Sequence, residues 1–179
     1  MNIQDGTWFS DNYENFKQFV CVMEAPSPCP HGWTYNSRSG YCYFVKEGLA
    51  SWEENEDWCF SQGGAHLASV HSDDENNFIT NLINFSEGEG YICGSDQLAW
   101  IGLYTVTNQT TWRWTDNSLF DYTAWATCKP DNAFRGANCA VIQNPQVCRN
   151  CTINVGNLRS WSDAMCYDNY KFGVCKKLP

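Results

Sequence analysis

The cysteines are the residues of this chain whose number and spacing could do chemistry. Eleven of them lie among 179 residues, and cysteines bind metal ions, carry out redox reactions or pair as disulfides. A zinc site would need two close pairs of ligands, but the sequence has a single Cys-x-x-Cys pair, Cys148 and Cys151. Disulfides formed in an oxidising compartment are therefore the better explanation.

Enzyme chemistry has little support in the sequence. The Cys148–Cys151 spacing matches a thiol redox pair, but the βαβ context that such enzymes need is missing. The three histidines, His31, His66 and His71, have no nucleophile motif near them. We therefore predict that the protein is not an enzyme and needs no cofactor.

Composition and charge exclude some classes of binding partner and indicate where the protein is located. A formal net charge of −9 argues against nucleic acid and against anionic membrane surfaces. No apolar run reaches the roughly 20 residues that span a bilayer, and the first residues have no signal-peptide pattern. Three sequons, at Asn84, Asn108 and Asn150, predict glycosylation of a secreted, extracellular protein.

Two helices are predicted in the first half of the chain. The first runs from Ser51, an N-cap residue, to Gln62, and two glycines end it. Its predicted buried side chains are Trp52, Cys59 and Phe60. The second begins with a capping box over Ser72–Glu75. Its apolar residues recur at helical spacing and are Phe78, Ile79, Leu82 and Ile83.

Strands dominate the rest of the chain. The predicted strands are His66–Val70, Ala99–Val106, Thr111–Thr115, Cys139–Gln143, Arg159–Ala164 and Lys171–Lys177. The tryptophans assigned to the core because they alternate within strands are Trp100, Trp112, Trp114 and Trp161. Two helices with mostly antiparallel strands predict an α+β domain.

The two ends of the chain are similar to each other. Residues 6–21 repeat the pattern of 159–175, a Trp-x-Ser/Asp stretch followed by an aromatic run that ends in cysteine. We interpret residues 1–21 as the tail of a preceding copy of the domain, 22–28 as a linker rich in Pro and Ser, and 29–177 as the domain. The alternative is chance similarity in an N-terminal extension.

The order of cysteines and aromatic motifs resembles the long form of the C-type lectin-like domain. The motifs, which cover roughly 29–177, are Cys29-Pro-His-Gly-Trp33, Cys42, Cys59, Trp100-Ile-Gly-Leu103, Asn138-Cys139, Trp161-Ser-Asp163, Cys166 and Cys175. The tandem arrangement and extra cysteines resemble secreted nematode and other invertebrate members, which are associated with innate host defence. The resemblance implies two helices, antiparallel sheets and a long upper loop, stabilised by disulfides.

The resemblance also implies three disulfides, Cys29–Cys42, Cys59–Cys175 and Cys139–Cys166. The cysteines that it does not place are Cys21, Cys93, Cys128, Cys148 and Cys151. One of the five must be unpaired or intermolecular. We predict that Cys21 is the odd residue, which would allow a disulfide-linked dimer, and that Cys128 pairs with Cys148 or Cys151.

In sugar-binding members of the family, a calcium ion binds the ligand. Its protein ligands come from a Glu-Pro-Asn or Gln-Pro-Asp triplet, from a Glu before the third conserved cysteine, and from a Trp-Asn-Asp strand. The matching positions here are Lys129-Pro130-Asp131, Ala137 and Ser162-Asp163. Only Asp131 and Asp163 keep a carboxylate, and an ammonium group has no lone pair to offer a metal. We expect Lys129 to form an ion pair with Asp131 or Asp163 in place of the metal.

The sequence therefore predicts a recognition module that binds a glycan or an extracellular protein without calcium. The candidate ligand-binding residues are Lys129, Pro130, Asp131, Asn132, Phe134, Arg135, Ser162 and Asp163. One alternative is a conventional calcium-dependent lectin, and a second is a structural or interaction domain of a tandem secreted protein. Residues 144–158 are interpreted as an insertion beside the ligand face.

Overall fold

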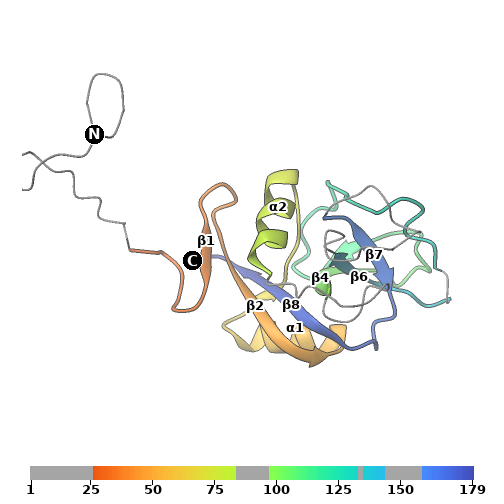
Figure 1. Ribbon diagram of the computed structural model, residues 1–179, viewed down its shortest axis with the longest axis horizontal. Coiled ribbons are helices and arrows are strands. Elements are labelled where there is room, and N and C mark those ends of the chain that lie inside the picture. Colours follow the sequence, from red (N-terminus) through yellow and green to blue (C-terminus); the bar gives the residue numbers. More distant parts are fainter. Residues whose placement is uncertain (1–25, 84–96, 133–134, 144–158) are drawn as a thin grey trace, which may run out of the picture.

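The computed structural model describes residues 26–83, 97–132, 135–143 and 159–179. These residues form two helices and an eight-stranded sheet (Figure 1). The elements are β1 (Thr34–Asn36), β2 (Tyr41–Ala50), α1 (Trp52–Ser61), β3 (His66–Leu67), α2 (Asp73–Leu82), β4 (Leu98–Tyr104), β5 (Arg113–Trp114), β6 (Cys139–Gln143), β7 (Trp161–Ala164) and β8 (Tyr170–Lys177). Within the described ranges, no helix is long and apolar enough to cross a membrane.

Several predictions fall on residues outside this description. They concern the N-terminal tail, the whole insertion at residues 144–158, and the residues Cys21, Asn84, Cys93, Phe134, Cys148, Asn150 and Cys151. They stay predictions.

The sheet has the strand order β1-β2-β8-β4-β6-β7, with β3 added to β8 and β5 added to β4. The β4–β8 pair is parallel, and the other pairs that form this sheet are antiparallel. The two helices lie on opposite sides of the central β2–β8 pair (Figure 1). The predicted α+β class with mostly antiparallel strands is confirmed.

Strands β1 and β2 were not among the predicted elements. Tyr43 of β2 packs into one apolar cluster and its neighbour Phe44 packs against the other. A strand that is packed on both faces lacks the apolar–polar alternation by which half-buried strands are found. Strand β2, which pairs with β1 and β8, was missed for this reason.

Helix α1 begins as the sequence predicts. The Ser51 side chain accepts a hydrogen bond from the Glu54 N–H, and the Glu54 carboxylate accepts one from the Ser51 N–H at 2.8 Å. The predicted burial of Phe60 is wrong, because 60% of this residue, which lies in the last turn of α1, is exposed. Asn55 is buried instead, and its Nδ2 donates to the backbone oxygens of Ala50 and Ser51.

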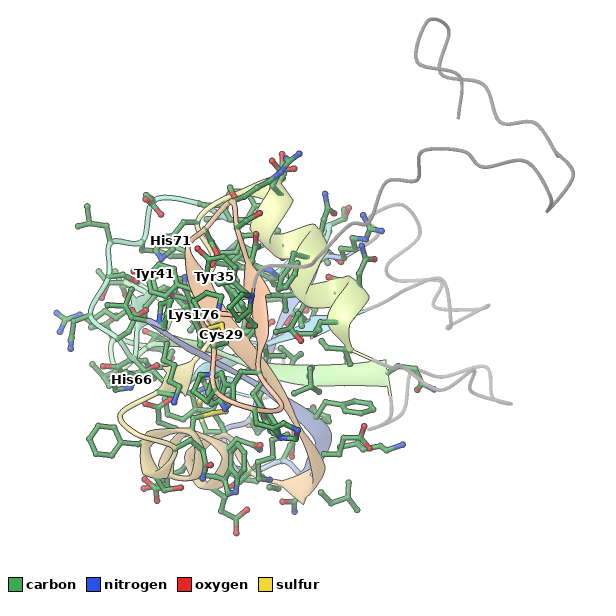
Figure 2. All side chains as sticks on the ribbon, turned by 90° about the vertical axis from the view of Figure 1, so that its left-hand side faces the viewer. Cys29, Tyr35, Tyr41, His66, His71 and Lys176 are labelled. Carbon is green, nitrogen blue, oxygen red and sulfur yellow. A yellow bond between two sulfur atoms is a disulfide. The ribbon has the colours of Figure 1, made fainter. Side chains whose placement is uncertain are left out.

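Helix α2 has the predicted N-cap but not the reciprocal capping contact. Ser72 accepts from the Glu75 N–H at 3.2 Å, whereas the buried Glu75 carboxylate accepts from the Tyr43 hydroxyl at 2.5 Å and from Lys176 Nζ at 2.6 Å. Its other oxygen accepts from the His71 N–H at 2.9 Å. The carboxylate is drawn inward because the buried Lys176 ammonium needs a counter-charge. Figure 2 shows Lys176 beside Tyr41, whose ring centroid is 4.4 Å from Nζ.

Three disulfides are present among the described residues, and they are the pairs that the family resemblance implies. They are Cys29–Cys42, Cys59–Cys175 and Cys139–Cys166. The predicted pairing of Cys128 with Cys148 or Cys151 is contradicted, because Cys128 carries a free, exposed thiol. Cys128 lies in a turn with a φ of 65° that leads into the cis peptide between Lys129 and Pro130.

The tryptophans assigned to the core are largely buried. Trp100, Trp114 and Trp161 are at most 1% exposed, while Trp112 is half-buried against Trp125. The Trp161 ring meets those of Trp114, Tyr122 and Trp125 edge-on, with centroids 5.6 to 5.8 Å apart. This aromatic cluster supports the start of the long loop, because Trp125 also forms a β-bridge to Trp161.

Candidate functional site

The predicted ligand-binding residues come from the long loop and strand β7. Strands β6 and β7 lie at the end of the molecule away from β1 and the C-terminus (Figure 1). The backbone of β7 is fixed by pairing with β6, in which Asp163 lies opposite Ala140. The rigid sheet therefore holds Asp163 at the base of the long loop.

Asp163 organises the loop through its carboxylate. The side chain is completely buried, and its oxygens accept hydrogen bonds from the Asp131 N–H at 3.3 Å and the Asn132 N–H at 2.8 Å. Gln109 Nε2 donates a third hydrogen bond at 2.7 Å. A buried carboxylate is stable only with such partners, so Asp163 ties three separate segments of the chain together.

Lys129 completes this arrangement with a positive charge. Its Nζ lies 2.9 Å from Asp131 Oδ1 and 3.5 Å from Asp163 Oδ1. Only 16% of the Lys129 side chain is exposed, so little water screens the pair with Asp163. The expected ion pair is thus present with both carboxylates. We call Gln109, Lys129, Asp131, Asn132 and Asp163 the loop cluster.

Asn132 shapes the turn that follows. Its Oδ1 accepts from the backbone N–H groups of Gly136 (2.7 Å) and Ala137 (3.3 Å). Its backbone oxygen accepts from the Arg135 N–H at 2.9 Å. Its Nδ2 donates to Asn108 Oδ1 at 3.0 Å. One asparagine therefore connects the long loop to the turn around Asn108.

The other predicted residues differ in how they relate to the loop cluster. Pro130 lies between two of its members, and Arg135 is exposed on the turn that Asn132 holds. Ala137 is buried, and its backbone oxygen accepts from Gln109 Nε2 at 2.7 Å. The Ser162 hydroxyl donates to the backbone oxygen of Asp163 at 3.3 Å rather than to a side chain of the cluster.

Sequence reasoning missed Gln109. It is 54 residues from Asp163 along the chain, and no local pattern marks a glutamine as the partner of a distant carboxylate. The sequon at Asn108 drew attention to this segment only as a glycosylation signal. The φ values of Asn108 and Gln109, 52° and 65°, show a tight turn that points Gln109 inward.

The described residues contain no group of three or more His, Cys, Asp or Glu side chains that could hold a metal ion. Two histidines have carboxylate partners: His66 Nδ1 lies 2.5 Å from Glu56 and His71 Nδ1 lies 2.7 Å from Asp121. The His71 contact holds the pKa of the Asp121 carboxyl below its usual range. Both histidines lie away from the loop cluster, on the face that Figure 2 presents.

Comparison with known proteins agrees with this architecture. Residues 49–177 match the family model of the lectin C-type domain. Lithostathine-1 of Mus musculus is 33% identical over 148 residues, which cover 83% of this chain and 78% of the relative. The galactose-specific lectin nattectin of Thalassophryne nattereri is 35% identical over 119 residues, 66% of this chain and 69% of the relative.

Among solved structures, the cow C-type carbohydrate-recognition domain of CD23, determined in the presence of a GlcNAc2Man3 oligosaccharide, superposes with a TM-score of 0.66. It is 26% identical, and the match covers 84% of this chain and 96% of that one. The match to the family model and these similarities together show that this chain belongs to the C-type lectin domain family.

Proposed function

We propose that this protein is an extracellular recognition module whose long-loop face binds a glycan or a protein ligand without calcium. The proposal depends chiefly on one observation, the Lys129 ammonium placed 2.9 Å from Asp131 and 3.5 Å from Asp163. In this position a protein cation already neutralises the carboxylates that a metal ion would use.

The residues at this position fit calcium poorly. Calcium takes six to eight oxygen ligands, and the loop cluster offers two carboxylates that Lys129 already pairs. Asp163 also accepts three hydrogen bonds from within the protein, which a calcium ion would have to displace. Ala137 adds no side-chain oxygen. We derive no calcium-dependent step from this site.

The extracellular location is supported by the three disulfides, since such bonds persist in oxidising compartments. A binding rather than an enzymatic role is supported by the membership of the family and by the loop cluster, whose side chains bond mainly to one another. The residues proposed to contact the ligand are Lys129–Asn132, Phe134, Arg135 and Ser162, and the buried Asp163 would act by holding the loop in place.

A calcium-dependent lectin is the second candidate function. It is favoured by similarity to a galactose-specific lectin and to a carbohydrate-recognition domain. This candidate requires that calcium displace the Lys129 ammonium from both carboxylates.

Calorimetric titration of the oxidised protein with calcium separates the two candidates. We expect no binding heat at millimolar calcium and the same melting temperature in excess chelator. Submillimolar binding, with a melting temperature that falls in chelator, would establish the second candidate instead. Glycan and protein ligands would then be sought in chelator or in calcium, according to the result.

A gain-of-binding variant tests the assigned positions. Lys129→Glu, Ala137→Glu and Ser162→Asn together restore the oxygen ligands that the family resemblance implies, and we expect this variant to bind calcium. Lys46→Glu, which makes in β2 the charge change of Lys129→Glu alone, serves as the control and should not bind. Failure of the correctly folded triple variant to bind would show that the metal-site positions are assigned wrongly.

A further inference from the structure

Asn108 connects a glycosylation signal to the proposed ligand face. The Asn108-Gln109-Thr110 triplet is a sequon, and the residues on either side of Gln109 are exposed. The backbone turns sharply here, with a φ of 52° at Asn108, a conformation that asparagine tolerates. The Thr110 hydroxyl donates to the Thr107 backbone oxygen at 2.7 Å and stabilises the turn. The acceptor side chain is therefore presented at the surface.

The contacts of Asn108 place any attached sugar beside the loop cluster. Asn108 Oδ1 accepts a hydrogen bond from Asn132 Nδ2 at 3.0 Å. Because Nδ2 of Asn108 belongs to the same planar amide as Oδ1, a sugar on that nitrogen starts next to Asn132. The backbone of Asn132 is in turn 2.8 Å from Asp163.

From these contacts we propose that an N-linked oligosaccharide on Asn108 lies over the loop cluster and controls access to the ligand face. This inference rests on the proposed function, since it concerns the same face. According to this proposal, ligand binding is regulated by a covalent modification of the protein, and that modification is an N-linked glycan. The ligand then binds most readily to protein molecules that lack this glycan.

The chemistry leaves the contact with Asn132 intact. The oligosaccharide comes from a lipid-linked oligosaccharyl diphosphate. The bond from the anomeric carbon of the first sugar to the diphosphate oxygen breaks, and that carbon bonds to Asn108 Nδ2. Nδ2 loses one proton, and the lipid diphosphate leaves. Oδ1 keeps its lone pairs, so it still accepts the hydrogen bond from Asn132.

Occupancy of Asn108 is measured first. In a eukaryotic secretory host, a protein with Asn84→Gln and Asn150→Gln keeps Asn108 as its single sequon. Intact mass spectrometry should show one glycan on this protein and on a version with Thr110→Ser, which retains both the sequon and the hydroxyl. The matched Thr110→Ala version should carry none. An unmodified Asn108 in the first two proteins would overturn the proposal.

Coverage of the loop is measured by limited digestion with trypsin. Arg135 is exposed on the turn that Asn132 holds, whereas Arg38, with a side chain 73% exposed, lies in the β1–β2 turn at the other end of the molecule (Figure 1). The glycan should slow cleavage after Arg135 several-fold and leave cleavage after Arg38 unchanged. Enzymatic removal of the glycan should restore the rate at Arg135. Equal rates at Arg135 with and without the glycan would overturn the proposal.

The calcium titration and the glycan experiments test the proposed function and the regulatory inference independently. Calcium binding to the protein would sink the calcium-independent function and leave occupancy and protection at Asn108 unaffected. An unglycosylated Asn108, or a glycan that does not protect Arg135 from trypsin, would refute the regulatory inference. Either result would leave the calcium titration unaffected.

Discussion

At the scale of single residues, the site is defined by how a buried carboxylate is neutralised. Asp163 has no exposed side-chain surface, and its charge is balanced by Lys129 and by three hydrogen-bond donors. Removing one partner of a buried pair leaves an uncompensated charge and is costly. The Lys129 ammonium is therefore expected to stabilise the fold of the loop as well as to shape its electrostatics.

Lys129→Met tests this role because it keeps the length of the side chain and removes the charge. We expect the free energy of unfolding to fall by about 1–3 kcal/mol, below the cost of breaking a fully buried pair, because Lys129 is partly exposed and Asp163 keeps its other donors. Urea unfolding at neutral pH measures the change. Lys46→Met, at a half-buried lysine of β2, is the control, and an equal effect of both variants would contradict the assigned role.

A second prediction at this scale concerns the reactivity of the Cys128 thiol. Its thiol is free and exposed, so we expect a maleimide to label it in the native protein without reductant or denaturant. Peptide mapping identifies the labelled residue, and Cys128→Ser should lose that label. Absence of label at Cys128 would mean that this cysteine is engaged in a disulfide.

At the scale of elements, helix α1 is fixed by its N-terminal cap. The Ser51 N–H donates to the Glu54 carboxylate, and this hydrogen bond lowers the pKa of Glu54 below its usual value. A lowered pKa in the folded state adds stability that is complete above the unfolded-state pKa of about 4.3 and is lost as the pH falls through the folded value. The cap of α1 should therefore weaken in acid.

Glu54→Gln separates this charge effect from the hydrogen bond itself, since the amide oxygen still accepts from Ser51. We expect the wild-type protein to be more stable than the variant near neutral pH, and the difference to shrink as the pH falls below the unfolded-state pKa of about 4.3. Thermal unfolding from neutral to acidic pH measures it. Glu53→Gln removes the same charge from the same turn, and an identical pH profile for both variants would refute the capping contribution.

At the scale of the whole molecule, the disulfides connect elements that are distant in the chain. Cys59–Cys175 joins α1 to β8 across 116 residues, whereas Cys29–Cys42 closes a span of 13. Crosslinks that close longer loops restrict the unfolded chain more strongly. The first of these disulfides should thus contribute more to the stability of the domain.

Paired substitution to alanine compares the two disulfides. Removing Cys59–Cys175 should lower the free energy of unfolding by about 4–5 kcal/mol, against about 3 kcal/mol for Cys29–Cys42. Denaturant unfolding of the oxidised variants gives both values. A larger loss for Cys29–Cys42 would show that native contacts near β1, rather than the length of the closed loop, decide the contribution.

The sequence by itself determined the features that depend on neighbouring residues. The N-cap at Ser51, the N-cap at Ser72 and strand β6 over Cys139–Gln143 lie where local patterns predict them. A cap or a short apolar strand depends on residues that are close together in the sequence, so the signal and the structure share the same short segment. The ordered cysteine motifs similarly pointed to the three disulfides through a family resemblance.

Only the tertiary structure decided which polar groups meet. Gln109 reaches Asp163 across 54 residues, and Glu75 turns from its own helix cap toward Lys176, 101 residues away. Such partners are chosen by where the sheet and loops bring buried charges together, because an unpaired buried charge is strongly unfavourable. The sequence led us to expect an ion pair of Lys129 with one of the two carboxylates, and only the fold showed that the ammonium lies near both Asp131 and Asp163.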